Sequence, residues 1–183
     1  MFYRILNENI KLVLTTTLLS EDISRLIDIN REYLKKWLPW LDNSNNPGDT
    51  RIFIESCLNG FSKMEQLHCS ILYNDSVVGL IGFNSINWTT KTGYIGFWLS
   101  EKETGKGIMT TAVKEIEKIG FIDLKLEKTE IRCAYENRKS RGIPERLGYK
   151  NEGIIRKAEN LYGQIVDHVV YGLLKDEYFK RQC

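Results

Sequence analysis

The stretch Gly105-Lys106-Gly107 places two glycines around a lysine, and an apolar run with helical spacing follows directly. The first amides of a helix have no partner within it, and the helix dipole adds partial positive charge at that end. Glycine lets a ligand approach the main chain closely. A strand, this turn and a helix in succession therefore predict a cradle for an anion such as a pyrophosphate, to which Lys106 could add charge. A plain loop that uses glycine for its geometry alone is the alternative.

Neither standard nucleotide motif describes this turn. A P-loop requires GxxxxGK[ST], and no such string occurs in the chain. A dinucleotide fingerprint requires GxGxxG, and Thr110 stands where its third glycine belongs. If the turn binds an anion, the ligand is therefore expected to be some other phosphate-bearing molecule.

A second block of interest is YENRKSRGIPERLGY, which follows a β-patterned run and contains Asn137 and Ser140. Taken alone, Asn137 could hold a turn and Ser140 could cap a short helix that ends at Gly148. Pro144 is expected near the start of this helix, where amides have no helical partner.

Hydrophobic periodicity predicts the elements that position these residues. Strand patterns occupy residues 10–14, 68–73, 77–84, 92–100, 128–136, 149–156 and 167–174, with a hairpin signal at 74–76. Helical patterns occupy residues 20–38, 49–66, 108–119 and 140–148, with Ser20 as the N-cap of the first. This order predicts an α/β protein with a mixed sheet, and it lacks the regular alternation of a doubly wound nucleotide fold.

Length and composition restrict the class of protein. At 183 residues the chain is most simply one domain, residues 1–183, and its 42% hydrophobic and 27% charged residues are ordinary for a soluble globular protein. A formal charge of +2 argues against a nucleic-acid binder that uses a broad basic face. No apolar run approaches the length of a membrane span, and the start lacks the pattern of a secretion signal.

The cysteines and histidines show no metal-ligand spacing, so no metal is expected. They are Cys57, Cys69, Cys133, Cys183, His68 and His168. Isolated cysteines without a signal peptide predict reduced thiols in a cytoplasmic protein. Cys133 is expected to pack in the core rather than act as a nucleophile, and His168 is expected to be structural.

The string GYIGFWLSEKETGKGIMTTAVKEI resembles the acyl-CoA-binding signature of the GNAT acetyltransferase superfamily, a strand followed by [Q/R]-x-x-G-x-[G/A] at the start of a helix. Gly107 takes the central glycine, whereas Thr104 and Met109 depart from the signature. The resemblance implies a single GNAT-type domain, with a mixed, mostly antiparallel twisted sheet flanked by helices and splayed strands that form the acyl-CoA cleft. It further implies that the CoA pyrophosphate and pantetheine arm are held by backbone groups of Gly105, Lys106, Gly107, Ile108, Met109, Thr110, Trp98 and Leu99.

The block around Asn137 and Ser140 is similar to a second superfamily pattern, N-x-x-S-x-x-x-x-[EK]-[KR]-x-G-[FY], which implies that both residues belong to the cofactor site. Within the superfamily the chain resembles the RimJ/RimL group of ribosomal-protein N-terminal (serine/alanine) acetyltransferases. Trp37 and Trp40 match its W-x-x-W element, and the spacing from Ser140 to Glu159 matches a serine and a glutamate that have catalytic roles there. The tryptophans are either core anchors or one wall of the acceptor cleft.

Acetyl transfer from a thioester to an amine needs a base for the amine, donors for the oxyanion and a proton for the departing thiolate. Glu159 is the candidate base, through a water, and an α-amine with a pKa of about 8 needs only a modest one. A solvated hairpin glutamate is the alternative for Glu159. Ser140 is the candidate donor to the sulfur, and a strand amide near Trp98 or Leu99 is the candidate oxyanion contact.

These features predict an acetyl-CoA-dependent N-acetyltransferase that needs no metal and acts in a ternary complex on a protein N-terminal α-amine. A small amine, such as a polyamine, an aminoglycoside or a compound in detoxification, is the alternative acceptor. A non-catalytic CoA-binding regulatory module is the alternative from another class. We expect a monomer or a homodimer, without a nucleic-acid or membrane partner.

Overall fold

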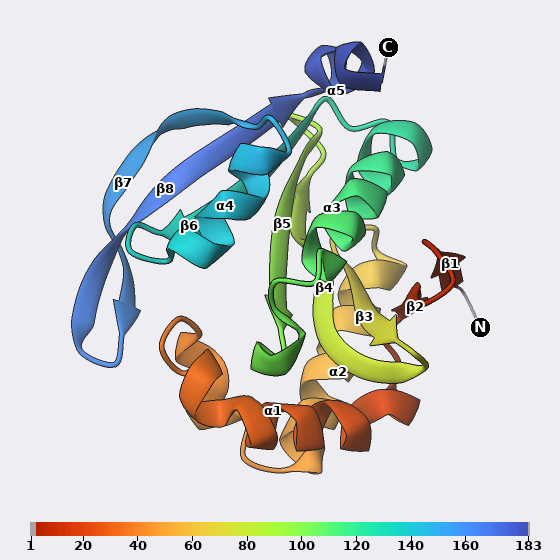
Figure 1. Ribbon diagram of the computed structural model, residues 1–183, viewed down its shortest axis with the longest axis vertical. Helices are drawn as coiled ribbons and strands as arrows, with labels where there is room; N and C mark the ends of the chain where they lie inside the picture. Colours follow the sequence, from red (N-terminus) through yellow and green to blue (C-terminus); the bar gives the residue numbers. More distant parts are fainter. Residues whose placement is uncertain (1–2, 183) are drawn as a thin grey trace.

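The computed structural model describes residues 3–182, which form an α/β fold on one eight-stranded sheet of order β1-β2-β3-β4-β5-β6-β8-β7 (Figure 1). The strands are β1 Tyr3–Ile5, β2 Ile10–Leu14, β3 Leu67–Tyr73, β4 Ser76–Asn87, β5 Thr92–Leu99, β6 Lys128–Ala134, β7 Lys150–Leu161 and β8 Gln164–Leu174. Within these residues the helices are α1 Ser20–Leu34, α2 Pro47–Ser62, α3 Ile108–Lys118, α4 Arg138–Arg146 and α5 Lys175–Gln182. The mixed, mostly antiparallel sheet confirms the predicted fold class.

The sheet is open between β5 and β6, the one parallel pair among the described strands. Residues 92–95 of β5 pair with residues 128–131 of β6, and both strands then continue without pairing to each other. The other neighbouring strands pair antiparallel. A gap therefore lies between residues 96–99 and 132–134, which is the splay that the family resemblance implied.

Hydrophobic side chains form one cluster on each face of the sheet. Ile81 of β4 belongs to the larger cluster with Ile116 of α3, whereas its neighbour Leu80 belongs to the second with Ile23 of α1 and Ile54 of α2. Because successive side chains of a strand point to opposite faces, α3 covers one face and α1 and α2 cover the other. The splayed ends of β5 and β6 therefore belong to a sheet with helices on both faces (Figure 1).

Two hairpins use residues in the left-handed region. Asn74 and Asp75 join β3 to β4 with φ of 49° and 62°, and Tyr162 and Gly163 join β7 to β8 with φ of 53° and 93°. Positive φ at both central residues is the requirement of a type I′ turn, which suits the twist of paired strands. The hairpin predicted at residues 74–76 is confirmed.

Three predicted helix starts or caps are wrong. The helix predicted over residues 140–148 is α4, which begins at Arg138; its N-cap is Asn137, and Ser140 is its third residue rather than its cap. Ser20 is the first residue of α1 and not its N-cap, because its Oγ donates to the carbonyl of Thr17 in a preceding 3-10 turn. The second helix begins at Pro47 rather than Asp49, because Asn46 caps it by accepting from the amides of Gly48 and Asp49. It ends at Ser62 and not at residue 66.

The expected place of Pro144 is also wrong. It lies in the second half of α4, not in its first turn. A proline there removes the hydrogen bond that its amide would give to the carbonyl of Ser140, four residues earlier. The strand β1 and the helix α5 were not predicted at all.

One carboxylate is fully buried beneath α5. Glu117 of α3 is 0% exposed and forms an ion pair with Arg181 of α5. Its Oε1 atom has no hydrogen-bond partner among residues 3–182. Burial raises the pKa of Glu117, and the charge of Arg181 opposes that rise. A charge that is costly to bury thus ties α5 to α3.

Cys57, Cys69 and Cys133 are buried free thiols, and burial raises their pKa values to about 11, 12 and 11. They are therefore thiols, not thiolates, near neutral pH. Cys183, also predicted to be reduced, lies outside the described residues. Among residues 3–182, no helix has both the length and the apolar character that a membrane crossing requires.

Candidate active site

The turn before α3 has the geometry of an open anion cradle. Gly105 and Gly107 have φ of +81° and +78°, and no described atom lies within 4 Å of the position that a Cβ would take on either. Gly107 is the N-cap of α3, and its carbonyl accepts from the amide of Thr111 at 3.0 Å. The amides of residues 108–110 precede that first helical bond, so they are available to a ligand at the positive end of the helix dipole.

The side chains around this turn leave the amides uncovered. Ile108 and Met109 are 1% and 6% exposed, so they anchor the turn in the core. Lys106 Nζ lies 2.7 Å from Oε2 of Glu103 and 5.6 Å from the centroid of the Tyr73 ring. Part of the positive charge that the sequence offers at Lys106 is therefore compensated within the turn.

The open edge of β5 presents backbone groups to the gap. The amide of Ser100 donates to the carbonyl of Val78 in β4 at 2.8 Å. Trp98, two residues earlier and paired with Leu80, therefore also points its backbone groups toward β4. Backbone groups alternate in direction along a strand, so those of Leu99 and Phe97 face the gap. This favours Leu99 and Phe97 over Trp98 as the source of backbone contacts, while the Trp98 side chain lines the cleft.

The N-terminus of α4 brings Asn137 and Ser140 to the gap. Asn137 is the N-cap, and its Oδ1 accepts from the amide of Ser140 at 3.2 Å. The Ser140 side chain lies near Cys133 on β6 and partly opposes the burial that raises the pKa of this thiol. Ser140 therefore reaches the face of β6 to which Cys133 points.

Glu159 on β7 meets His168 on β8. Oε2 of Glu159 lies 3.1 Å from Nε2 of His168, and the two side chains are 29% and 16% exposed. His168 pairs with Ala134 of β6, the residue after Cys133. Because neighbouring residues of a strand point to opposite faces, Ser140 and the Glu159–His168 pair approach the end of β6 from opposite faces.

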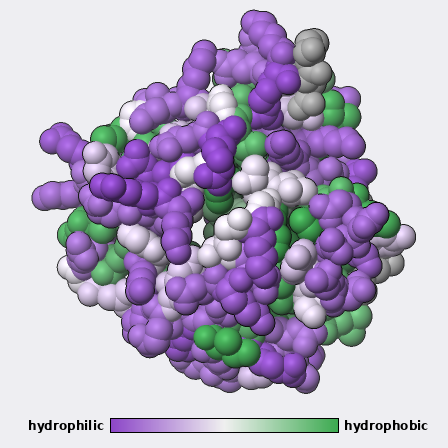
Figure 2. All heavy atoms as spheres, in the orientation of Figure 1, coloured by the Kyte–Doolittle hydropathy of each residue, from purple (hydrophilic) through white to green (hydrophobic). Residues whose placement is uncertain are grey.

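A cleft of about 1520 Å³ joins these groups, and Figure 2 shows the surface hollowed near the centre of the face that it draws. Of the residues predicted for the site, the cleft is lined by Trp37, Trp40, Trp98, Leu99, Gly105, Gly107, Ile108, Met109, Thr110, Asn137, Ser140 and Glu159. Lys106, turned toward Glu103, is not among the lining residues. Cys133 and His168, which were expected to be structural, also line the cleft.

Comparison with known proteins identifies the family. The profile of the acetyltransferase (GNAT) domain matches residues 11–150. The chain belongs to the GNAT acetyltransferase family. It is 31% identical to the putative ribosomal N-acetyltransferase YdaF of Bacillus subtilis (strain 168), over 97% of this chain and 98% of that protein. It is 30% identical to the ribosomal-protein-serine acetyltransferase of Escherichia coli (strain K12), over 78% and 85% of the two chains.

Solved structures of this family agree with the fold. The microcin C7 self immunity acetyltransferase MccE, in complex with acetyl-CoA and AMP, superposes with a TM-score of 0.87 at 30% identity, covering 92% of this chain and 94% of that one. RimL, the ribosomal L7/L12 alpha-N-protein acetyltransferase in complex with coenzyme A, superposes with a TM-score of 0.92 at 22% identity, over 96% and 99%. The chain is thus a GNAT N-acetyltransferase of the RimJ/RimL-like group.

In this GNAT enzyme the tip of the β7–β8 hairpin contacts the segment after α1, and that segment lines the cleft. The Tyr162 hydroxyl at the hairpin tip donates to the carbonyl of Leu38 at 2.8 Å, and Lys35 Nζ lies 4.6 Å from the centroid of the Tyr162 ring. Trp37 and Trp40 flank Leu38 and line the cleft, and Trp40 is 37% exposed. Neither tryptophan belongs to the two hydrophobic clusters of residues 3–182.

The GNAT enzyme has further cleft residues that sequence reasoning missed. Asn84 is the extra residue at a bulge in β4, and its side-chain amide lies over Gly96, where a Cβ would come within 2.2 Å of it. His68 packs edge-on against Phe53 with ring centroids 5.8 Å apart, and burial lowers its pKa to about 4. The β-bulge of β4 and the contact of His68 with Phe53 depend on residues that are distant in the sequence, so no local sequence pattern predicts them.

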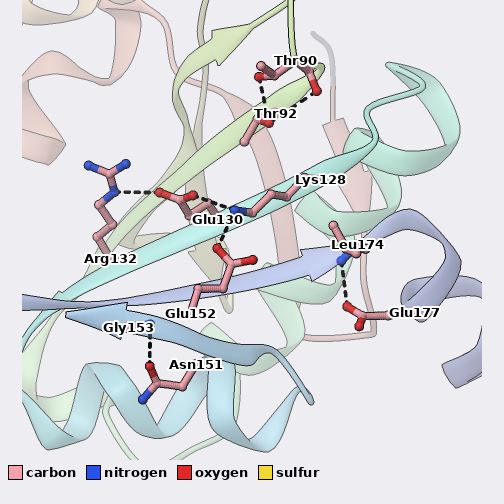
Figure 3. Close-up of polar contacts among 10 residues, drawn as sticks. All are labelled: Thr90, Thr92, Lys128, Glu130, Arg132, Asn151, Glu152, Gly153, Leu174 and Glu177. Atoms are coloured by element: carbon pink, nitrogen blue, oxygen red, sulfur yellow. Dashed lines mark hydrogen bonds and ion pairs between the residues drawn. The ribbon is translucent and has the colours of Figure 1, made fainter. Parts of the chain in front are cut away.

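A row of charged side chains follows β6 from Arg132 through Glu130 to Lys128 (Figure 3). Glu130, which is 7% exposed, lies between Arg132 at 2.7 Å and Lys128 at 3.0 Å, and Lys128 also pairs with Glu152 at 2.5 Å. Glu130 and Arg132 line the cleft. Because its two cations compensate it, Glu130 does not present a free negative charge to an acceptor.

Proposed function

We propose that this enzyme binds acetyl-CoA in the gap between β5 and β6 and transfers the acetyl group directly to the N-terminal α-amine of a protein. The observation that carries the proposal is the end of β5–β6 pairing at Ile95 and Ile131, in the same cleft as the first residues of α3. The pyrophosphate would bind those amides and the two glycines, and the pantetheine arm would bind the backbone edge of Leu99. The acetyl-CoA and coenzyme A in the structures of MccE and RimL support this donor.

The groups around the end of β6 suit the three demands of the reaction. As the amine nitrogen bonds to the thioester carbon, a strand amide at Leu99 or Phe97 would stabilise the oxyanion. Glu159, directly or through a water, would take the proton that the amine loses. The C–S bond then breaks, and the Ser140 hydroxyl would donate a hydrogen bond to the thiolate of CoA. Positioning of the two substrates across the gap would supply much of the rate.

The names of the relatives support a ribosomal-protein acceptor. YdaF is called a putative ribosomal N-acetyltransferase, and the Escherichia coli relative is called a ribosomal-protein-serine acetyltransferase. A peptide N-terminus is a slender acceptor, which suits the part of the cleft lined by Trp37 and Trp40, beside the Tyr162 hairpin tip. An α-amine also needs less help from a base than a lysine amine does, because its pKa is lower by about 2.5.

A second acceptor class has its own support. MccE matches the chain at 30% identity, and its structure contains AMP beside acetyl-CoA. A small amine attached to a nucleotide or another compact polar group is therefore the second candidate. The aromatic side chains Tyr94 and Trp98 in the cleft could stack against such a group.

Calorimetry and turnover test these proposals separately. Coenzyme A should bind in a one-to-one ratio, and Gly107→Glu should abolish binding because a carboxylate would enter the cradle. Unchanged binding in that variant would remove the donor site. Acetyl-CoA turnover is then measured with peptides that begin with serine or alanine, with the same peptides blocked at the N-terminus, and with small amines. Turnover of small amines alone would replace the N-terminal proposal by the second candidate.

A further inference from the structure

Glu159 and His168 form a polar pair on the acceptor face of the cleft. The 3.1 Å contact joins Oε2 of Glu159 to Nε2 of His168, and both side chains line the cleft. An ionised carboxylate can only accept hydrogen bonds. If Glu159 acts as an ionised base, the contact uses an N–H on Nε2 of His168, and the Oε1 atom of Glu159 is left for another partner.

We propose that His168 is a positioning residue that orients the Glu159 carboxylate toward the amine of the acceptor, an inference that rests on the proposed function. The imidazole N–H holds one carboxylate oxygen, so the other is directed toward the amine or a bridging water. When the amine attacks, its N–H bond breaks and the proton passes to Glu159. His168 itself neither gains nor loses a proton in this step.

The backbone of β7 is shaped to bring the two side chains together. Ile155 pairs with His168 and Glu159 pairs with Val166, so β7 advances four residues while β8 advances two. The two extra residues form a bulge, and because their number is even, Glu159 stays on the face of His168. A regular ladder would place Glu159 two residues farther along β8 and out of reach.

A side chain from β8 fixes that bulge. Lys157 has a φ of 53°, and its amide donates to Oδ1 of Asp167 at 2.8 Å. Asp167 directly precedes His168, so the same short stretch of β8 holds both the bulge and the carboxylate that the bulge presents. Bulges of this kind re-aim side chains next to active sites.

Kinetics of matched variants test the positioning role. His168→Leu removes the donor, and kcat should fall by about 10-fold or more, within the factor of about 10²–10⁴ that a whole general base contributes. The KM for acetyl-CoA should stay within about twofold, because the substitution removes no group proposed to bind acetyl-CoA. His168→Gln places an N–H donor at a similar distance and should restore most of kcat. In a Glu159→Gln background, His168→Leu should cause no further loss, and an additive loss would overturn the proposal.

Nitrogen NMR supplies a test that does not depend on activity. The chain contains two histidines, and His68, packed against Phe53, serves as an internal control. At neutral pH the wild-type His168 should show a protonated Nε2, and its ¹⁵N shift should change in Glu159→Gln while that of His68 does not. A proton on Nδ1 alone, or an unchanged shift in the variant, would overturn the proposal. Absence of amine acetylation by the wild type would instead defeat the proposed function, and the NMR result would still decide the orientation of Glu159.

Discussion

The amide of Ser140 donates to Oδ1 of Asn137 at 3.2 Å. Asn137 is thus the N-cap of α4, and Ser140 is the third residue of that helix. The contact uses the side chain of Asn137 and only the backbone of Ser140. The hydroxyl of Ser140 remains directed to Cys133 and the cleft. Their contributions to stability and to chemistry can therefore be separated by mutation.

Asn137→Ala should reduce stability. Loss of an N-cap side chain costs about 0.5–2 kcal/mol. Chemical denaturation should show this decrease in the free energy of unfolding, whereas Asn137→Ser, which retains a capping oxygen, should recover most of it. Equal stability of the alanine variant and the wild type would mean that the cap contributes nothing to folding.

Ser140→Ala should lower kcat and leave stability nearly unchanged. A hydrogen bond to a charged group contributes about 1.5–3 kcal/mol, so loss of the donor to the departing thiolate should lower kcat by about 10- to 150-fold. The melting temperature and the affinity for CoA should change little. A variant with full kcat would exclude Ser140 from the chemical step.

Gly107→Ala should weaken CoA binding. The φ of +78° disfavours any residue with a Cβ by about 1–2 kcal/mol, and the new methyl group would also stand where the ligand approaches. Gly148→Ala is the matched control, because Gly148 has a φ of +74° and lies outside the residues that line the cleft. Calorimetry should show a loss of affinity at position 107 alone, with similar losses of stability in both variants. Equal affinities would argue against close approach at Gly107.

Glu103→Gln should tighten the binding of CoA. The variant removes one negative charge from the edge of the cradle, where it pairs with Lys106, and one charge at a helix N-terminus is worth about 0.3–1 kcal/mol. We expect the Kd measured at low salt to fall by about two- to fivefold and the difference to shrink at high salt. Weaker binding by the variant would show that Glu103 organises the turn rather than opposing the anion.

Glu117→Gln should flatten the pH dependence of stability. Burial raises the pKa of Glu117 above the value in the unfolded chain, so the folded state binds the proton more tightly. The corresponding stabilisation is complete below the ordinary glutamate pKa of about 4.3 and is lost as the pH rises through the folded-state value. Melting temperatures between the acidic range and neutral pH should therefore fall less in the variant than in the wild type. Parallel curves would show that Glu117 does not titrate differently in the folded state.

The parts of the fold that were predicted correctly have strong local patterns. The apolar period of residues 108–119 defines α3, and Asn74-Asp75 between two β runs defines a hairpin. The errors lie where a neighbour in space decides the outcome. The side chain of Asn46 caps α2, so the helix begins two residues earlier than predicted. Strand β1 has three residues, which is too short for a hydrophobic period to be recognised.

The candidate site divides in the same way. The glycine turn and the Asn137–Ser140 block are each one short continuous stretch, so a local sequence motif is enough to locate either of them. The contact between His168 and Glu159 could not be predicted, because the two residues belong to different strands. Only the bulge in β7 brings that carboxylate within 3.1 Å, and a bulge depends on strand pairing rather than on local composition.

Because β5 and β6 pair over a short stretch, the hydrophobic core and whatever fills the gap supply the remaining contacts between the two halves of the sheet. Four residue pairs join the two halves, and the exposed edge of residues 96–99 must otherwise be hydrated. A molecule that spans the gap replaces that water and bridges the halves, so resistance to unfolding follows its free concentration by mass action. At a hundred times Kd the gain is about 2.7 kcal/mol. The supply of the donor would then govern how long each copy of the enzyme survives, as well as how fast it works.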